Sequence, residues 1–267
     1  MARSSGDGTV GKALQVLEEV AEFGRPVRFS EVLAVSEFPK PTLYRLIQTL
    51  SSQGMLDHDP ETNLYSPGTR LVRLAHAAWR QSSLAQVARP HLEALSNLTG
   101  ETVHLAKLDS AQVLYLDKCN AAQPVEMYSD AGKVGPAYCT GVGKTMLAFL
   151  PEEDSASLIG QQSFHKFTEH TITTEQALRD ELKEIRSLGY GFDREEHEPS
   201  IICVSVPILT PNGRVRGAVS VTSTTQRTDL AGLESHIPHI QKTAQAIASD
   251  AQRWSFPDQI QPSETRI

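Results

Sequence analysis

Residues 139–150 read CTGVGKTMLAFL, and the string GVGKT within them is typical of sequences that hold a phosphate or another anion. A nucleotide-binding P-loop needs a further glycine five positions before its Gly-Lys-Ser/Thr. That position is Tyr138, which cannot take the backbone conformations open to glycine. The approach to the string is also rich in turn-forming residues and does not resemble a buried strand. Nucleotide binding is therefore the less favoured interpretation.

A simpler chemistry fits the same residues. Thr140 can cap a helix over residues 142–150, which Pro151 ends. Gly141 and Gly143 leave the backbone N–H groups of the first turn uncovered by side chains, and the helix dipole favours negative charge there. The stretch predicts a site for a single small anion at a helix N-terminus.

Other residues with catalytic or metal-binding chemistry lack partners at a useful spacing. There is no Gly-x-Ser-x-Gly sequence, and Cys139 and Cys203 have no base partner that the sequence identifies. His236 and His239 flank a proline without a third ligand, and the acidic run 195–198 resembles a polar loop at the rim of a pocket. We therefore expect no catalysis, no cofactor and no metal. A metabolite-binding enzyme of unknown reaction, with a small helical N-terminal domain, is the alternative.

The composition suits two modest domains or one large one, since the chain has 267 residues, of which 39% are hydrophobic and 21% charged. No apolar run approaches the roughly 20 residues of a membrane span. The N-terminal residues lack the apolar core of a signal peptide, and three scattered cysteines favour reduced thiols. These features predict a cytoplasmic protein with no membrane partner.

Charge is unevenly distributed along the chain. The net charge is −7, yet residues 1–80 hold nine basic and nine acidic side chains, so residues 81–267 carry the whole excess. Within residues 38–54 the only charges are the positive ones of Lys40 and Arg45. A neutral N-terminal part with a locally basic helix is compatible with DNA binding.

Three helices and a hairpin are expected in the first 68 residues. Thr9 can cap the first helix, which ends at Gly24, and Ser30 can cap a short second helix. The third has Pro41 in its first turn and Gly54 just past its end. Strand-like pieces around a Pro/Asn turn follow at residues 55–65. Two helices joined by a tight turn and followed by a hairpin describe a winged helix-turn-helix, in which the later helix enters the major groove. The same pattern also fits a small domain of three helices and a hairpin with no DNA partner.

The third helix has two distinct faces. Its apolar residues recur at i, i+3, i+4 and i+7, which predicts a stripe that packs inward. The other face is small, polar and basic. The candidate DNA-contacting residues on this helix and at the start of the second are Ser30, Lys40, Thr42, Tyr44, Arg45 and Gln48.

Mixed helices and strands follow, with one strong hairpin signal at residues 211–213. The fold class is therefore α+β, with the winged helix-turn-helix followed by an α/β domain around one sheet. The expected helices cover residues 69–79, 83–98, 174–188 and 230–251, and the expected strands cover 102–108, 112–117, 201–209 and 215–223.

Two stretches of the chain resemble the IclR family of bacterial transcriptional regulators, and the resemblance covers about residues 9–250. The first is GKALQVLEEVAEFG…EVLAVSEFPKPTLYRLIQTLSSQGML, which departs at Pro41, where the family commonly has Ser. The second follows the family signature Gly-x3-Asp-x2-Glu-x6-Cys-Val-Ser and departs at residues 209–210. Its matching residues are Gly189, Asp193, Glu196, Cys203, Val204 and Ser205.

The resemblance implies a GAF/PAS-like effector-binding domain whose pocket takes a small organic acid. Backbone N–H groups at a helix start would hold the carboxylate, two strand hydroxyls would hydrogen-bond to it, and an aspartate would accept from a hydroxyl of the same ligand. Carried over by position, with Met146 added from the same helix, the candidate ligand-binding residues are Gly141, Val142, Met146, Asp193, Cys203, Ser220 and Thr222.

These observations predict a ligand-responsive regulator that binds double-stranded operator DNA and represses a catabolic operon, with a small carboxylate or sugar acid as its effector. The resemblance and the two-fold symmetry of operators suggest self-association as a dimer or a dimer of dimers. The expected order is a disordered start (1–8), the DNA-binding domain (9–68), a linker helix (69–82), the effector-binding domain (83–252) and a tail (253–267).

Overall fold

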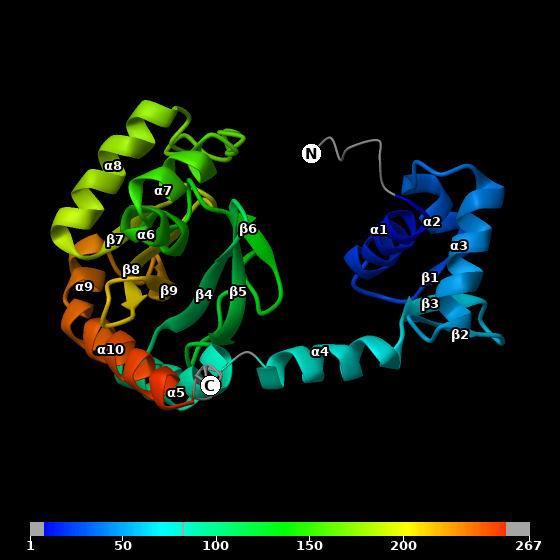
Figure 1. Ribbon diagram of the computed structural model, residues 1–267, viewed down its shortest axis with the longest axis horizontal. Coiled ribbons are helices and arrows are strands. Elements are labelled where there is room, and N and C mark those ends of the chain that lie inside the picture. The colour runs from blue at the N-terminus through cyan, green and yellow to red at the C-terminus, as the bar shows by residue number, and fades with distance from the viewer. Residues whose placement is uncertain (1–7, 82, 255–267) are drawn as a thin grey trace, which may run out of the picture. The chain divides into compact units, whose positions relative to one another are not determined.

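The computed structural model describes residues 8–81 and 83–254 (Figure 1). The chain divides into two compact units, with the boundary between Gln81 and Ser82. The predicted class, a winged helix-turn-helix followed by an α/β domain, is confirmed. Across the described ranges no helix is both long and apolar enough to span a membrane.

The N-terminal unit is a helical core with a three-stranded antiparallel sheet of order β1-β3-β2. The apolar stripe of the third helix is buried as predicted, against the first helix and the sheet. Gly54 ends this helix in the left-handed conformation, with φ of 67°. The elements are α1 (Thr9–Glu22), β1 (Val27–Arg28), α2 (Phe29–Val35), α3 (Lys40–Ser52), β2 (Leu56–Asp59), β3 (Leu64–Pro67) and α4 (Thr69–Gln81).

Two predicted helix caps are wrong. Gly8, not Thr9, occupies the N-cap position of α1. Arg28, not Ser30, occupies that of α2, and its N–H donates to the Glu31 carboxylate at 2.8 Å. The reason is the short strand β1, which the sequence did not suggest: Arg28 pairs with Leu64 and runs directly into the helix.

The C-terminal unit is built on one antiparallel sheet of six strands, in the order β6-β5-β4-β9-β8-β7. Its strands are β4 (Thr102–Asp109), β5 (Gln112–Cys119), β6 (Val134–Pro136), β7 (Gly191–Arg194), β8 (Ile201–Leu209) and β9 (Val215–Thr224). Its helices are α5 (Ser83–Thr99), α6 (Gly141–Phe149), α7 (Glu152–Ile159), α8 (Glu175–Leu188), α9 (Leu230–Glu234) and α10 (Ile237–Trp254).

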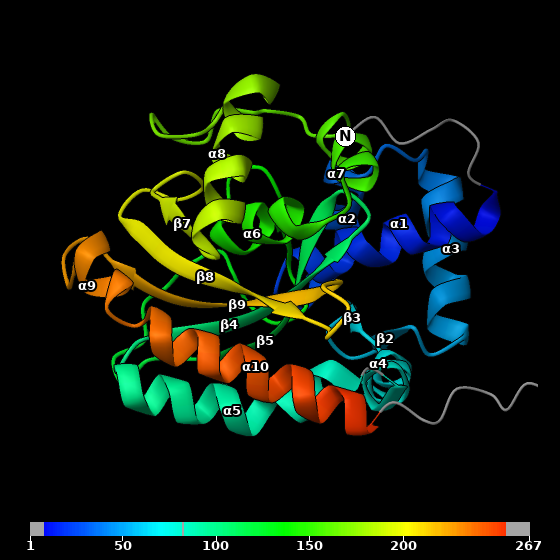
Figure 2. The same cartoon turned by 60° about the vertical axis from the view of Figure 1, so that its left-hand side comes forward.

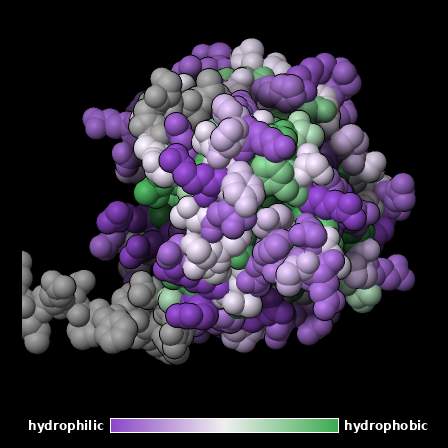
Figure 3. Space-filling model, turned by 90° about the vertical axis from the view of Figure 1, so that its right-hand side faces the viewer, coloured by the Kyte–Doolittle hydropathy of each residue, from purple (hydrophilic) through white to green (hydrophobic). Residues whose placement is uncertain are grey.

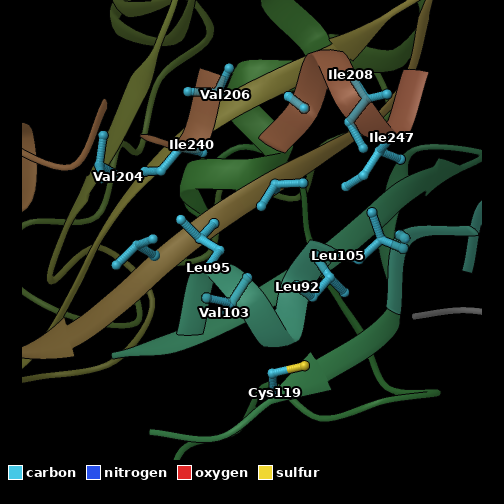
Figure 4. Close-up of a cluster of buried hydrophobic side chains, with 14 of the residues drawn as sticks. Leu92, Leu95, Val103, Leu105, Cys119, Val204, Val206, Ile208, Ile240 and Ile247 are labelled. Carbon is cyan, nitrogen blue, oxygen red and sulfur yellow. The ribbon is translucent and has the colours of Figure 1, made fainter. Parts of the chain in front are cut away.

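Helices cover both faces of this sheet. Helices α5 and α10 lie side by side on one face, and α6, with α8 behind it, lies on the other (Figure 2). Because successive strand residues point to opposite faces, Val103 and Leu105 face α5 and α10, whereas His104 and Ala106 face α6. The core beneath α5 and α10 is aliphatic, with Leu92, Leu95, Val204, Val206, Ile240 and Ile247 among its buried side chains (Figure 4).

The structure adds elements that the sequence did not suggest, namely β6, α7 and β7. The helix predicted over residues 230–251 is two helices, α9 and α10, which Ser235 and His236 separate. Pro238 lacks a backbone N–H and lies in the first turn of α10, where none is needed, so it favours a new helix start. Helix α10 continues to Trp254, and the predicted tail beyond it and the start at 1–7 lie outside the described residues.

Candidate functional site

The first candidate site is the outer face of α3. Lys40, Tyr44, Arg45 and Gln48 are exposed and Thr42 is half-buried, so all five predicted residues of this helix are accessible. The side of the molecule that carries α3 is mainly hydrophilic (Figure 3). A polar helix surface with basic side chains suits the major groove and its phosphate edges.

One ring contact and one hydrogen bond hold the two helices of the helix-turn-helix together. The Tyr44 ring, 55% exposed, packs edge-on against Phe29 of α2, with 5.9 Å between ring centroids. Ser30 is exposed in the first turn of α2 and is free of the capping role predicted for it. In the turn between the helices, Phe38 N–H donates to Ser36 Oγ. The recognition face is therefore held on a packed support.

The second candidate site is a cavity of about 30 Å³ on the α6 face of the sheet in the C-terminal unit. The strands place polar side chains in two rows across this face. Asp193, Cys203 and Thr222 form one row, because β7, β8 and β9 pair them in register. In the second row Ser220 lies opposite His104 of β4. Six of the seven residues predicted for ligand binding line the cavity: Gly141, Val142, Asp193, Cys203, Ser220 and Thr222.

Met146 is the prediction that fails. It is buried in the apolar cluster beneath α6 and does not line the cavity. It lies one helical turn after Val142, on the same side of α6 but farther from the helix N-terminus and from the cavity. Its helical spacing indicated the core, and this is where it lies.

The N-terminus of α6 forms one wall of the cavity. Thr140 occupies the N-cap position, but its side chain does not cap the helix as predicted: the hydroxyl donates to the Pro136 carbonyl at 2.8 Å. A Cβ added at Gly141 would overlap the Cys203 sulfur and lie 3.3 Å from the backbone nitrogen of Asp193. Glycine is required here because the helix start approaches the strands so closely.

Lys144 is paired with two carboxylates of its own unit. It is fully buried, and its Nζ contacts Glu196 and lies 2.9 Å from Glu181 Oε1. Arg194 also reaches Glu181, at 2.8 Å. The two carboxylates raise the pKa of Lys144 despite its burial, so the lysine is charged. The string that resembled a P-loop therefore supplies the cation of a buried ion cluster, and Glu196 is a partner in that cluster as well as a residue of the family signature.

Three groups that line the cavity, Asp193, His104 and Cys203, are neutral near pH 7. Burial, reinforced by the negative charge of Glu196, raises the pKa of Asp193 to about 8, so this carboxyl retains its proton. Burial lowers the pKa of His104 to about 3 and raises that of the Cys203 thiol out of the physiological range. A bound anion would lie against the helix N-terminus and these three uncharged groups, and the protonated Asp193 would not repel it.

Asp193 gives this unit a testable pH dependence. A carboxyl whose folded pKa is raised from 3.8 to about 8 stabilises the fold most at low pH, and this contribution is lost as pH rises from about 4 to 8. Asp193→Asn keeps the acceptor for the Glu196 N–H and removes the titration. Urea titrations at pH 5–8 give the free energies of unfolding of the parent and the variant. The difference, parent minus variant, should fall by up to about 1.4 kcal/mol for each unit by which pH rises. A difference that stays level over this range would refute the protonated state.

The sequence missed part of the cavity wall. The acidic run at 195–198 was placed correctly at the rim, since His197 and Glu198 both line the cavity, although Glu196 is buried beneath it. Period-two alternation would have placed His104 on the polar face of its strand, but nothing local marks the remaining residues. The lining residues not predicted as ligand-binding are His104, Tyr115, Ser129, Thr140, His197, Glu198 and Ile201. In the described ranges no three His, Cys, Asp or Glu side chains are grouped as a metal ion requires.

Comparison with known protein families matches both units. Residues 9–60 match the IclR helix-turn-helix domain, and residues 76–249 match the domain described as bacterial transcriptional regulator IclR C-terminal. The chain is 31% identical over 240 residues to the HTH-type transcriptional regulator XynR of Escherichia coli strain K12. The matched residues cover 90% of this chain and 95% of that protein.

Solved structures show the same fold. The Thermotoga maritima IclR structure is 29% identical, with a TM-score of 0.75 over 91% of this chain and 98% of its own. An IclR homolog from Microbacterium hydrocarbonoxydans, complexed with 4-hydroxybenzoate, is 22% identical, with a TM-score of 0.79 over 92% of this chain and 100% of its own. The family consists of DNA-binding regulators and not enzymes, which removes the metabolic-enzyme alternative. The chain belongs to the IclR family of bacterial transcriptional regulators.

Proposed function

We propose that this regulator controls a catabolic operon, as a repressor, in response to a small carboxylic acid that binds in the cavity beneath α6. The observation that carries the proposal is the convergence of the uncapped α6 N-terminus with the hydroxyls of Ser220 and Thr222 and the protonated Asp193. Helix N-terminal N–H groups bind a carboxylate, and hydroxyls bind its remaining oxygen atoms. The Microbacterium homolog, whose ligand is also a carboxylic acid, supports the same class of effector.

The cavity volume favours the smaller members of this class of acids. About 30 Å³ corresponds to roughly two or three water-sized volumes, which favours a short 2-oxo or 2-hydroxy acid. A larger sugar acid would need the rim around His197 to open. The test is a panel of short acids, of sugar acids and of ATP and GTP, scored by melting temperature and by retardation of a promoter fragment from neighbouring genes. An increase in melting temperature with the nucleotides and with none of the acids would refute the proposal.

Arg45 is the side chain on which we expect DNA affinity to depend most. Replacing it with Ala should cost a base or phosphate contact, about 1–3 kcal/mol in operator binding. The melting temperature should stay unchanged, since the buried stripe of α3 is untouched. Lys183→Ala removes the same charge from an exposed position of the other unit and should bind operator normally. Operator affinity of the Arg45 variant equal to that of the parent would mean that α3 is not the recognition helix.

Self-association is a further expected outcome. Apolar side chains remain exposed on the N-terminal unit, among them Val10 and Leu14 of α1 and Val72 and Leu74 of α4. Leu71 of α4 packs against the core of its own unit. We propose that the exposed side chains are covered by a second copy, as a dimer or a dimer of dimers. Sedimentation at micromolar concentration should show these species, and a monomer there would exclude them.

A further inference from the structure

His104 connects the two sides of the cavity. It is 2% exposed and lies opposite Ser220 in the pairing of β4 with β9. Its ring Nδ1 is 3.2 Å from Thr222 Oγ1, and Thr222 Oγ1 is 3.4 Å from Ser220 Oγ. On the other side of the ring, Nε2 is 3.0 Å from Ser129 Oγ. Ser129, His104, Thr222 and Ser220 form, in this order, a continuous hydrogen-bonded row that borders the cavity.

A neutral imidazole has one N–H, so this row has two arrangements. If Nδ1 holds the proton, it donates to Thr222, Ser129 donates to Nε2, and the Thr222 hydroxyl proton is free to point into the cavity. If Nε2 holds the proton, it donates to Ser129, Nδ1 accepts from Thr222, and Thr222 offers only lone pairs to a ligand. Burial lowers the pKa of His104 to about 3, which keeps the ring neutral and both arrangements available.

We propose that His104 is a positioning residue, whose ring tautomer decides whether Thr222 donates or accepts a hydrogen bond toward the effector. The inference rests on the proposed acid-binding function. With the carboxylate at the α6 N-terminus, a 2-oxo group offers only an acceptor and selects the Nδ1–H tautomer. A 2-hydroxyl can donate as well as accept, so it can also use the Nε2–H tautomer. His104 thereby lets one pair of strand hydroxyls receive either kind of acid.

The same tautomer determines the bonding of Ser129, at the far end of the row. The neighbouring Tyr128 N–H donates to both carboxylate oxygens of Glu198, at 2.8 and 3.0 Å, and Lys118 Nζ donates to the Ser129 carbonyl at 2.9 Å. These contacts hold the Ser129 segment at the cavity border independently of His104. Ser129 can therefore serve as donor or acceptor without leaving its place.

The experiment uses the full-length protein with three acids of similar size: pyruvate, lactate and propionate, the last having no 2-substituent. His104→Phe keeps a ring against Tyr115, whose centroid lies 5.4 Å from that of His104, and removes both hydrogen bonds. We expect it to weaken pyruvate binding about tenfold in calorimetry and propionate binding less than twofold. His104→Asn retains a polar group near Thr222 and should bring pyruvate affinity back to within threefold of the parent. His239→Asn, at an exposed position of α10, is the matched control and should bind like the parent.

Imidazole ¹⁵N shifts supply a readout that a packing role would not change. His104 should take the Nδ1–H form with pyruvate bound and move toward the Nε2–H form with lactate. Equal weakening of all three acids in His104→Phe, or the same tautomer with pyruvate and lactate, would overturn this inference while leaving acid binding intact. Failure of the parent protein to bind any of the acids would overturn the proposed function and this inference with it.

Discussion

Replacing Lys144 with Met is expected to lower the free energy of unfolding by about 3–5 kcal/mol, because it leaves the buried carboxylate of Glu196 without its cation. Among the described residues Glu196 would keep the backbone N–H of Arg194, 3.4 Å from its Oε1, and its Oε2 has no hydrogen bond. Arg194 continues to neutralise part of the Glu181 charge, so the loss centres on Glu196. Urea unfolding followed by circular dichroism at pH 7 measures the effect.

A second substitution separates charge from packing. Lys144→Met combined with Glu196→Gln removes both members of the closest pair and should recover most of the lost stability, since a buried pair contributes little relative to an uncharged replacement. Lys183→Met, at an exposed lysine paired with Asp180 on α8, should change stability by less than about 1 kcal/mol. A Lys144→Met protein as stable as this control would mean that the ion cluster does not hold α6 to the strands.

Gly141→Val is expected to abolish the response to acids and to lower the melting temperature of the C-terminal unit without ligand, while operator binding without ligand persists. The added Cβ would occupy the space of the Cys203 sulfur and crowd Ser205 Oγ at 3.4 Å, and the branched side chain would cover the helix N–H groups. In the parent, an acid at 100 times its Kd should add about 2.7 kcal/mol to stability, visible as a higher melting temperature. The variant should show no such increase and no ligand-dependent change in operator affinity.

Two other glycines serve as controls for this substitution. Gly160→Val places its Cβ no closer than 3.6 Å to any atom, so acid binding should be unaffected. A Cβ at Gly143 would lie 2.5 Å from the Ala137 carbonyl oxygen, so Gly143→Val should destabilise the unit whether or not ligand is present. A Gly141→Val protein whose melting temperature still rises with the acids would mean that the α6 N-terminus does not bind the carboxylate.

The effector can change operator binding only if it binds the DNA-binding and DNA-releasing states of the protein with different affinities. A ligand changes operator binding by at most the ratio of its affinities for the DNA-binding and DNA-releasing states. Retardation assays with saturating pyruvate and lactate, in parallel with calorimetry, would give that ratio directly. For a repressor, the acid that raises the melting temperature most should also lower operator affinity.

The sequence by itself determined the elements whose signals are local. Helical spacing specified the buried stripe of α3, the Pro-Asn-Gly turn specified the β8–β9 hairpin, and Thr174 and Gly189 marked the ends of α8. Resemblance to the family then supplied six residues that do line the cavity. The capping residues of α1 and α2 were misjudged, and Thr140 holds the N-cap position of α6 without a side-chain cap, because a cap depends on where the preceding backbone goes, and for α2 on a strand pairing with residues more than 30 positions away.

Only the tertiary structure decided which side chains meet across the sheet. His104 and Thr222 are separated by 118 positions, and Lys144 and Glu196 by 52, so no local pattern relates them. The string at 141–145 predicts an anion site, which stays a prediction, and it misdirected attention for Lys144, since spacing alone cannot tell a cation that points toward a ligand from one that points into the core. Strand register and the packing of α6 on the sheet settle that choice, because burial of a charge is tolerated only where the fold brings its opposite charge into contact.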